Sequence, residues 1–210
     1  MSDEIERLLR RGPGEQGAQT DARAASQRLV ARMLSEDLAD VTYASVDSPF
    51  GAMHAAVTHK GLVRLAFPEE DPESMLEQLA RRISPRILSA PARLDPLRRE
   101  LEEYFQGRRR RFEVPLDWSL IGPFARRVLR RTADIPYGGS LSYAEVAAEA
   151  GSPRGARAAG NALGSNPIPI LIPCHRVLRA GGALGGYGGG LQRKRLLLEL
   201  EGALTPPLAG

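Results

Sequence analysis

The 210-residue sequence has one cysteine and three histidines, and this shortage removes several classes of protein at once. A single cysteine excludes an internal disulfide and, with so few histidines, the four-ligand cysteine and histidine cage typical of structural zinc sites. No apolar run reaches the ~20 residues that cross a bilayer. The start, MSDEIERLLRR, is too acidic and too weakly apolar for a signal peptide. These absences predict a cytoplasmic protein with no membrane contact, bound metal or cofactor.

Lysine is also scarce, because Lys60 and Lys194 are the only two and arginine therefore supplies most of the positive charge behind the net +4. A modestly basic chain can bind nucleic acid, but many basic proteins do not. Two stretches are dense in arginine, GRRRRFE at 107–113 and FARRVLRR at 124–131. We expect each to form a solvated loop or helix face unless it lies near a chemical site.

The first forty residues read as an extension of the chain, which we expect to be mobile. RRGPGEQGAQTDA at 10–22 has the glycine, glutamine and charge content of a flexible loop. ARAASQRLVARMLSEDL at 22–38 follows with apolar residues at helical spacing. Composition alone assigns this extension no role.

The remaining sequence predicts an α+β fold in two domains. YASVDSPFGAMHAAVTHKGLVRLAF at 43–67 alternates around two turn signals, as consecutive antiparallel strands do. Two helices are then expected at 71–83 and 94–107, capped by Asp71 and Asp95 before prolines. The predicted division is a small N-terminal α+β domain over 41–117, a mainly helical C-terminal domain over 118–204 and a tail over 205–210.

The C-terminal half contains a predicted helix-turn-helix. In SYAEVAAEAG, Ser142 and Glu145 form a capping box and Gly151 can end the helix in a left-handed conformation. Ser152 and Pro153 are expected to begin the second helix, RGARAAGNALG. Its small side chains, interrupted by Arg157, suit either close packing against another helix or close approach to the minor groove of DNA.

The only cysteine follows a run of prolines in NPIPILIPCHRVL, at 166–178. Prolines cannot donate to a sheet ladder, so PIPILIP is expected to be a rigid extended segment or an edge strand that delivers Cys174. A lone buried cysteine is most often inert packing, because reactivity requires an environment that favours the thiolate. Beside it, His175 could relay a proton, either directly through a sharp turn or through a water molecule.

These motifs follow one another in a fixed order: the helix-turn-helix, then SNPIPIL, IPCHRV and GGYGGGLQRKRLLLELEG. In this order they closely resemble the O6-alkylguanine-DNA alkyltransferases, or methylated-DNA–protein-cysteine methyltransferases. The resemblance is dense over 124–202, looser over 43–118 and absent from the first forty residues. It implies a ribonuclease-H-like N-terminal domain and direct, irreversible, single-turnover repair of O6-alkylguanine in duplex DNA. O4-alkylthymine is a further candidate substrate.

The resemblance also assigns the reaction residue by residue. Cys174 matches the acceptor of the alkyl group, His175 the base that takes its proton through water, and Glu201 the carboxylate that orients the histidine. Glu199 would point elsewhere on a helix, so Glu201 is preferred. Asn166 matches the hinge asparagine between the recognition helix and the active-site segment.

The remaining matches concern the flipped base and its pocket. Tyr143 looks like the tyrosine that crowds the target phosphate and donates to the leaving guanine, and Lys194 like the lysine that assists it. Arg157 matches the arginine that fills the stack vacated by the base. The DNA-facing small residues would be Ala156, Ala158 and Gly160, and the pocket would include Tyr187, Gly188, Pro169 and the carbonyl of Val177.

Two other functions remain open. A cysteine hydrolase would share Cys174, His175 and a carboxylate but would not need the small-residue helix with Arg157. A non-catalytic alkyltransferase-like lesion-binding protein would share the fold but lack the acceptor cysteine. GGYGGG has the spacing of a phosphate loop, yet Leu191 and Gln192 stand where lysine and serine or threonine should follow, which argues against nucleotide binding there. The expected partner is damaged duplex DNA, bound by a monomer.

Overall fold

The computed structural model describes residues 24–26, 28–30, 32–33, 35–36 and 38–204. The chain divides into two compact units, Met1–Ala39 and Asp40–Gly210. In the first unit the described residues from 24 to 35 are helical, in agreement with the helix expected at 22–38. The flexible loop expected at 10–22 and the tail at 205–210 lie outside the described residues.

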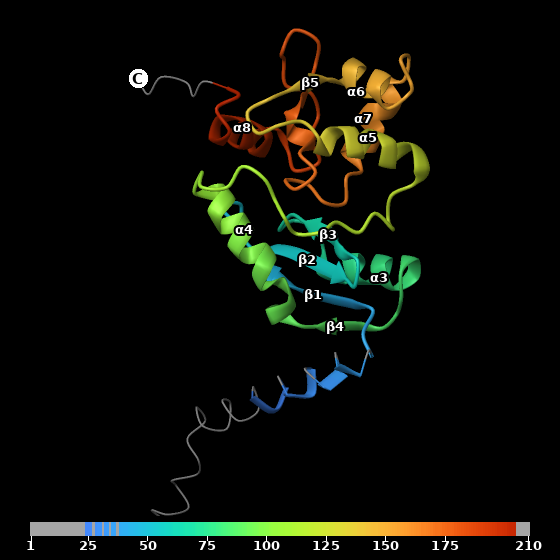
Figure 1. Ribbon diagram of the computed structural model, residues 1–210, viewed down its shortest axis with the longest axis vertical. Helices are drawn as coiled ribbons and strands as arrows, with labels where there is room; N and C mark the ends of the chain where they lie inside the picture. Colours follow the sequence, from blue (N-terminus) through green and yellow to red (C-terminus); the bar gives the residue numbers. More distant parts are fainter. Residues whose placement is uncertain (1–23, 27, 31, 34, 37, 205–210) are drawn as a thin grey trace, which may run out of the picture. The chain divides into compact units, whose positions relative to one another are not determined.

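The second unit begins with a four-stranded sheet in the order β3-β2-β1-β4 (Figure 1). β1 (Val41–Val46), β2 (Met53–Thr58) and β3 (Gly61–Ala66) pair antiparallel, as the alternating sequence predicts. The short β4 (Ile87–Ser89) pairs parallel to β1. Gly61 needs to be glycine because its φ is +130° and a Cβ there would strike the backbone of Pro115.

Helices α3 (Pro72–Arg82) and α4 (Asp95–Phe105) cover opposite faces of this sheet. Asp71 caps α3 as predicted, with its carboxylate accepting from the Ser74 N–H. The cap predicted at Asp95 is wrong. A 3₁₀ helix, η1 (Pro91–Leu94), runs directly into α4, so Asp95 already lies inside the helix and its carboxylate accepts from Arg98 instead.

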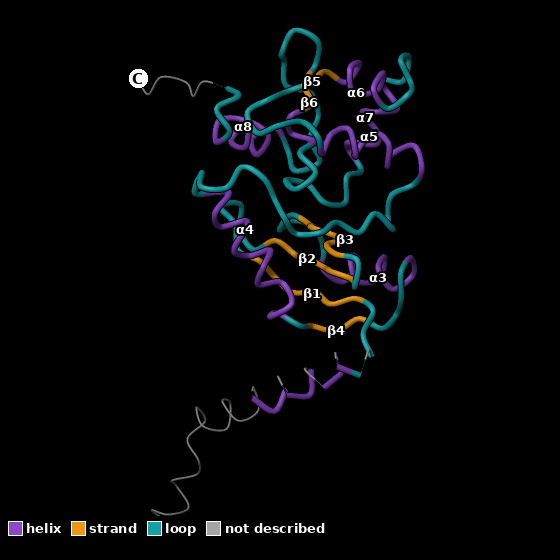
Figure 2. The backbone as a smooth tube through the Cα atoms, viewed as in Figure 1, coloured by secondary structure: helices purple, strands orange, loops and turns teal. Residues whose placement is uncertain are grey.

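The regular structure of the C-terminal half is mostly helical and is joined by long loops (Figure 2). Its helices are α5 (Pro123–Ala133), α6 (Tyr143–Glu149), α7 (Ala156–Gly164) and α8 (Leu191–Leu200). Two short parallel strands, β5 (Leu141–Ser142) and β6 (Val177–Leu178), and a 3₁₀ turn, η2 (Cys174–Arg176), complete it. The predicted capping box of α6 is confirmed, and Gly151 beyond its end has φ +79°. The capping box and the position of Gly151 could be predicted because each depends only on residues that are close in the sequence.

The second of the paired helices begins later than predicted. α7 starts at Ala156 with Gly155 as its cap residue, whereas Ser152 and Pro153 belong to the preceding turn. The Gly155 N–H donates to the Ser152 carbonyl at 2.8 Å, which closes that turn. A Cβ on Gly155 would strike the Ser152 side chain, so glycine is required there.

The segment before Cys174 is also not the extended segment or edge strand that its prolines predict. Pro169 and Ile172 form a local bridge, and the Ile172 N–H donates to the Ile168 carbonyl at 3.0 Å. Ile170 has φ +74°, a left-handed conformation that a β-branched residue rarely adopts. The segment is therefore a compact buried turn, and it joins the sheet where the Leu65 N–H donates to the Pro167 carbonyl.

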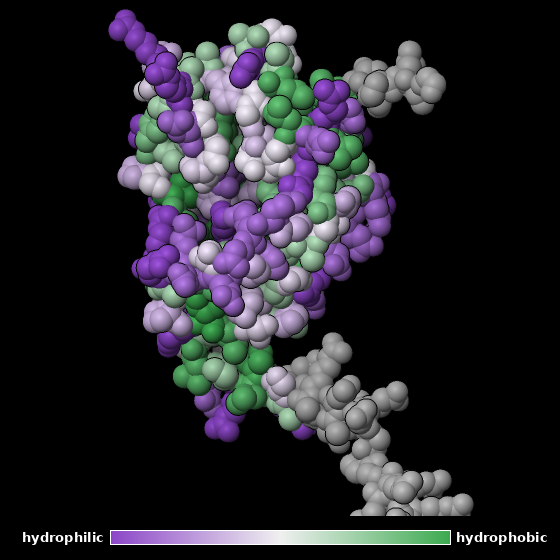
Figure 3. Space-filling model, turned by 180° about the vertical axis from the view of Figure 1, so that it is seen from behind, coloured by the Kyte–Doolittle hydropathy of each residue, from purple (hydrophilic) through white to green (hydrophobic). Residues whose placement is uncertain are grey.

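One apolar core joins the two halves of the second unit. Its buried members come from β1 to β3, α4, α5, α6, α7 and α8 and include Cys174. A smaller cluster lies under α3. On the face drawn in Figure 3, hydrophilic side chains predominate across the middle, as a chain with 26% charged residues requires.

Candidate active site at Cys174

Cys174 opens the 3₁₀ turn η2 and is only 6% exposed. Its Sγ lies 3.2 Å from the Asn166 Nδ2 group, which donates to it, and it borders a cavity of about 340 Å³. Burial raises the pKa of the thiol to about 11, although the Asn166 hydrogen bond and nearby Lys194 act in the opposite direction. The thiol is therefore protonated at neutral pH, whereas a reactive cysteine is expected to have a lowered pKa.

Asn166 fixes the turn that carries the cysteine. Besides Sγ, its Nδ2 donates to the Ile172 carbonyl at 2.8 Å, and its Oδ1 accepts from the Ile168 N–H at 3.0 Å. These bonds close the 166–174 segment on itself and help hold Ile170 in its strained conformation. Asn166 thus ties the end of α7 to the cysteine.

His175 is fully buried and faces away from solvent toward Glu201. The imidazole Nε2 and the Glu201 Oε1 are 2.9 Å apart, so Nε2 carries the hydrogen that is shared with the carboxylate. Burial lowers the pKa of His175 despite the opposing effect of Glu201, which keeps the ring neutral. Nδ1 is then a free acceptor, and it is buried without a partner among the described residues.

Glu201, at the C-terminal end of α8, is the most heavily hydrogen-bonded group of the site. Oε1 also accepts from the Tyr104 hydroxyl at 2.6 Å and from Arg176 Nη2 at 2.9 Å, while Oε2 accepts from Arg176 Nε at 2.8 Å. Burial by itself would raise the pKa of Glu201, but the His175 and Arg176 contacts outweigh it and lower the pKa to about 2. The carboxylate is therefore ionised throughout the physiological range.

Sequence reasoning missed Arg176 and Tyr104. Arg176 directly follows the Cys-His pair, and its charge in an apolar run was a signal for a buried carboxylate partner. Tyr104 lies on α4, 97 positions before Glu201, and is fully buried. A buried tyrosine needs a partner for its hydroxyl, but the sequence does not say which one.

Lys194 and Tyr143 form a second group near the cysteine. Lys194 Nζ donates to the Val177 carbonyl at 2.6 Å and lies 5.8 Å from the centre of the Tyr143 ring. Burial lowers the pKa of Lys194 to about 8. The Tyr143 hydroxyl donates to the Gly186 carbonyl at 3.1 Å, and burial raises its pKa, so the hydroxyl keeps its proton at neutral pH.

The cavity beside Cys174 brings together most of the residues expected to contact a base. Tyr187, Gly188, Pro169 and Asn166 line it with the cysteine. The Tyr187 hydroxyl is buried without a partner among the described residues. Val177, which was expected in this pocket, is not among the residues that line the cavity. Its carbonyl accepts a hydrogen bond from Lys194. The remaining lining residues, which the sequence did not single out, include Arg64, Phe67, Glu70 and Gln78 from the N-terminal half.

A second, open hollow of about 510 Å³ shares Gly164, Tyr187 and Gly188 with this cavity. It is lined by Arg157, Gly160 and Tyr143, and also by Arg179, which sequence reasoning did not select. Arg157 and Ala158 on α7 are exposed, and Ala156 is half-buried. Arg157 and Gly160 of α7 and Tyr143 of α6 therefore line the same hollow, which Ala156 and Ala158 do not line.

In the part of the chain that the structure describes, no helix is long and apolar enough to span a membrane, and no group of acidic, histidine or cysteine side chains could hold a metal ion.

Comparison with known proteins places this geometry in a family. Residues 41–118 match the model of the 6-O-methylguanine DNA methyltransferase ribonuclease-like domain, and residues 123–203 match that of its DNA-binding domain. The methylated-DNA–protein-cysteine methyltransferase of Mycobacterium tuberculosis is 41% identical over 167 residues, covering 79% of this chain and 95% of that protein. The inducible methylated-DNA–protein-cysteine methyltransferase of Bacillus subtilis is 36% identical over 149 residues, covering 70% and 83%.

A solved structure supports the same assignment. The crystal structure of Mycobacterium tuberculosis OGT in complex with DNA covers 76% of this chain and 92% of that protein, with 40% identity and a TM-score of 0.65. The two family models together cover well over half of the sequence, in the same order as the sheet-containing and helical halves described above. The chain therefore belongs to the 6-O-methylguanine DNA methyltransferase family.

Proposed function

We propose that Cys174 accepts the alkyl group in a DNA repair reaction. In this reaction the alkyl group of O6-alkylguanine in duplex DNA is transferred to the cysteine sulfur. The chain is a DNA-binding methyltransferase of DNA repair, as its family and relatives indicate. The observation that supports the assignment to Cys174 is its position in a cavity beside a neutral histidine with one free nitrogen. Cys174 is also the only cysteine in the sequence.

The proposed step begins with a proton leaving the thiol. The neutral His175 Nδ1 takes it through one bridging water, and the imidazolium that forms is stabilised by the ionised Glu201. The sulfur then attacks the alkyl carbon, so that an S–C bond forms while the C–O6 bond breaks. The electron pair of that bond stays on the guanine.

The leaving guanine must gain a proton, and we assign this to the Tyr143 hydroxyl. Tyr143 keeps its proton at neutral pH, and the Lys194 ammonium near its ring favours the transient negative charge on the phenol oxygen. The proton taken up by His175 can then be returned to Tyr143 through solvent. The products are guanine and S-alkylcysteine, and the atoms balance without a cofactor.

The proposed DNA contact uses α6, the following turn and α7 as a helix-turn-helix in the minor groove. α7 presents small side chains and the exposed Arg157 beside the hollow that leads to the cysteine. Arg157 would replace the flipped base in the stack, at a cost of a few kcal/mol that is smaller for a poorly paired alkylated guanine. We propose that the protein binds as a monomer and that residues 41–117 and 118–204 act as its two domains.

A thioether is a poor leaving group, so the proposed reaction consumes the protein. The test is intact-mass measurement after incubation with an O6-methylguanine duplex, for the native chain and for Cys174→Ser, with an unmodified duplex as control. We expect one methyl group to be added to the native chain only. Sustained turnover, or methylation of the serine variant, would reject the assignment. An O4-methylthymine duplex in the same assay tests the second substrate.

The same samples separate the two rival functions. A cysteine hydrolase would cleave an ester without binding DNA, and a non-catalytic lesion-binding protein would bind the alkylated duplex without gaining mass. Neither rival accounts for a thiol in one hollow and Arg157 in a second hollow that shares three lining residues with the first. A free thiol as the reactive group also supports a reducing, cytoplasmic location.

A further inference from the structure

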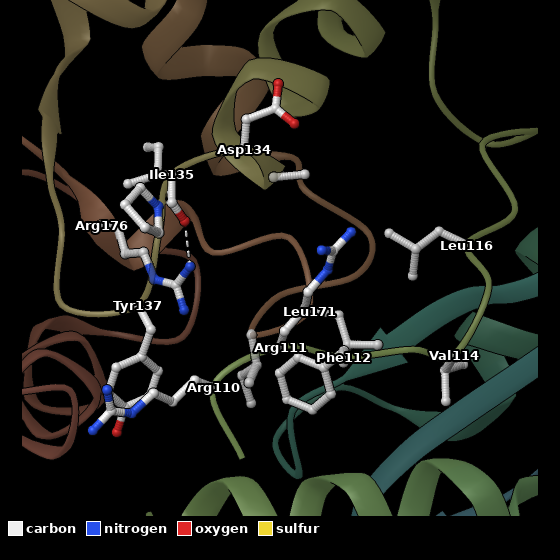
Figure 4. A pocket seen from close by; sticks show the side chains of 13 residues that line it. Arg110, Arg111, Phe112, Val114, Leu116, Asp134, Ile135, Tyr137, Leu171 and Arg176 are labelled. Carbon is white, nitrogen blue, oxygen red and sulfur yellow. Dashed lines mark hydrogen bonds between the residues drawn. The ribbon is translucent and has the colours of Figure 1, made fainter.

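A further cavity is lined neither by Cys174 nor by His175. Its volume is about 710 Å³, within the ~300–1,000 Å³ typical of small-molecule sites. It shares no lining residue with the cavity beside Cys174 or with the hollow beside Arg157. The walls come from both halves of the second unit, with the 110–116 segment on one side and the 133–137 segment and Arg176 on the other (Figure 4). We call it the arginine-rimmed cavity.

Three guanidinium groups border this cavity, and two of them have no acidic partner. Arg110 lies 5.6 Å from the centre of the Tyr137 ring, and neither Arg110 nor Arg111 forms an ion pair within the described residues. In Figure 4, Arg111 and Arg176 extend toward the cavity from opposite walls. Both unpaired arginines belong to the arginine run at 107–113, which the proposed repair function does not use.

The acidic groups nearby are already engaged. Asp134 lines the cavity, but it is paired with Arg131 at 3.1 Å. Glu201 behind the wall is held by Arg176 and His175. Arg176 uses three of its five N–H groups, on Glu201 and on the Ile135 carbonyl, so two remain for a ligand. The cavity therefore carries a net positive charge and unused donors.

The rest of the lining is apolar, and includes Phe112, Val114, Leu116, Ile170 and Leu171. Guanidinium groups bind phosphate in a bidentate manner, and aromatic and aliphatic side chains bind flat apolar bodies. We propose that the arginine-rimmed cavity binds a small organic phosphate of nucleoside monophosphate size, with the phosphate between Arg111 and Arg176. Because the cavity shares no lining residue with the DNA-facing hollow, a free small molecule fits it better than a phosphate of duplex DNA bound at that hollow.

The experiment is titration of the full chain with adenosine monophosphate by isothermal calorimetry. The variant is Arg111→Gln, and the matched control is Arg108→Gln, which removes a neighbouring exposed arginine that does not line the cavity. We expect saturable binding by the native chain and the control, and at least tenfold weaker binding by Arg111→Gln. Adenosine without phosphate should bind far more weakly.

Three results would overturn the assignment. The first is no saturable binding with a Kd below about 1 mM. The second is equal affinity in Arg111→Gln, or for adenosine and its monophosphate. The third is displacement of the nucleotide by an unmodified duplex, which would place it on the DNA surface. Alkyl transfer by both variants should be unchanged, so failure here is distinguishable from failure of the repair assignment.

Discussion

At the scale of single residues, the site depends on how burial and hydrogen bonding divide charge between neighbours. The carboxylate of Glu201 is ionised because Arg176 and His175 donate to it, while His175 stays neutral because it is buried. Cys174 keeps its proton for the same reason. The site therefore holds a neutral thiol and a neutral imidazole beside an ionised carboxylate.

The low pKa of Glu201 predicts a loss of stability in acid. Its pKa is about 2 in the folded chain and about 4.3 when unfolded, so the unfolded chain binds more protons between these values. The contribution of Glu201 is complete above the unfolded pKa and is lost as pH falls toward the folded one. We expect the difference in unfolding free energy between the native chain and Glu201→Gln to shrink from about pH 5 to pH 2.

Urea unfolding at a series of pH values measures this difference. Glu199→Gln is the control, because Glu199 lies on the same helix, is only half-buried and makes no contact with His175. It should follow the native profile. A gap between native and Glu201→Gln that does not change with pH would contradict the prediction.

Lys194 predicts a gain of stability in alkali, with the same sign of pH dependence as Glu201. Burial lowers its pKa to about 8, whereas an unfolded lysine has a pKa of about 10.4, so the unfolded chain again binds more protons between the two. The penalty for burying the ammonium is therefore relieved as pH rises through this window. Relative to Lys194→Met, the native chain should gain stability from about pH 8 to pH 10, which chemical unfolding can detect.

The exposed Lys60 supplies the control for that measurement. Lys60→Met should run parallel to the native chain across the same range. If the unfolding free energies of the two lysine variants depend on pH in the same way, burial does not lower the pKa of Lys194.

At the scale of elements, α7 contains a glycine that lowers the stability of the helix and that lies on the surface proposed to contact DNA. Gly160 lies mid-helix and lines the hollow with Arg157, and a Cβ there would meet the Tyr143 ring at an ordinary 3.7 Å. Glycine inside a helix costs about 1 kcal/mol relative to alanine. The fold itself therefore does not need glycine at this position.

Gly160→Ala should accordingly stabilise the protein by about 0.5–1 kcal/mol, measured by thermal or urea unfolding. Its affinity for duplex DNA should fall severalfold, because the added methyl group keeps the DNA backbone from the helix surface. Fluorescence anisotropy with a labelled duplex measures the second effect. Unchanged affinity would mean that α7 does not approach DNA at Gly160.

The elements that could be predicted from the sequence are those whose formation depends on residues close to one another in the chain. The strand alternation over 43–67, the Asp71 cap and the capping box of α6 need only neighbouring residues. The turn at 166–174 could not be predicted, because its prolines suit an extended chain equally well. Asn166 and the contact from Leu65 to Pro167 select the turn, and both act across the folded structure.

At the scale of the whole molecule, the Glu201 carboxylate receives hydrogen bonds from both halves of the second unit. Tyr104, from the sheet-containing half, donates to Glu201 in the helical half. One apolar core also spans both halves. The resemblance indicated the acceptor cysteine, the histidine and the carboxylate, but not Tyr104, because this partnership exists only after α4 and α8 have packed.

Tyr104→Phe tests that partnership. A hydrogen bond to a charged group is worth about 1.5–3 kcal/mol, so the unfolding free energy should fall by that amount. Because the carboxylate then holds His175 less firmly, alkyl transfer should also slow, as measured by single-turnover kinetics. The control is Tyr137→Phe, which loses only a bond to the Leu200 carbonyl. A Tyr104→Phe variant with native transfer rate would limit Tyr104 to a structural role.

The position of Glu201 at the end of α8 has a consequence for how the protein is made. Tyr104, His175 and Arg176 all leave the ribosome before the carboxylate that they bind. A growing chain that still lacks α8 holds these groups without their shared partner and cannot orient the histidine. If the proposed mechanism holds, a chain that stops upstream of residue 201 should therefore fail to transfer the alkyl group even though the cysteine is present.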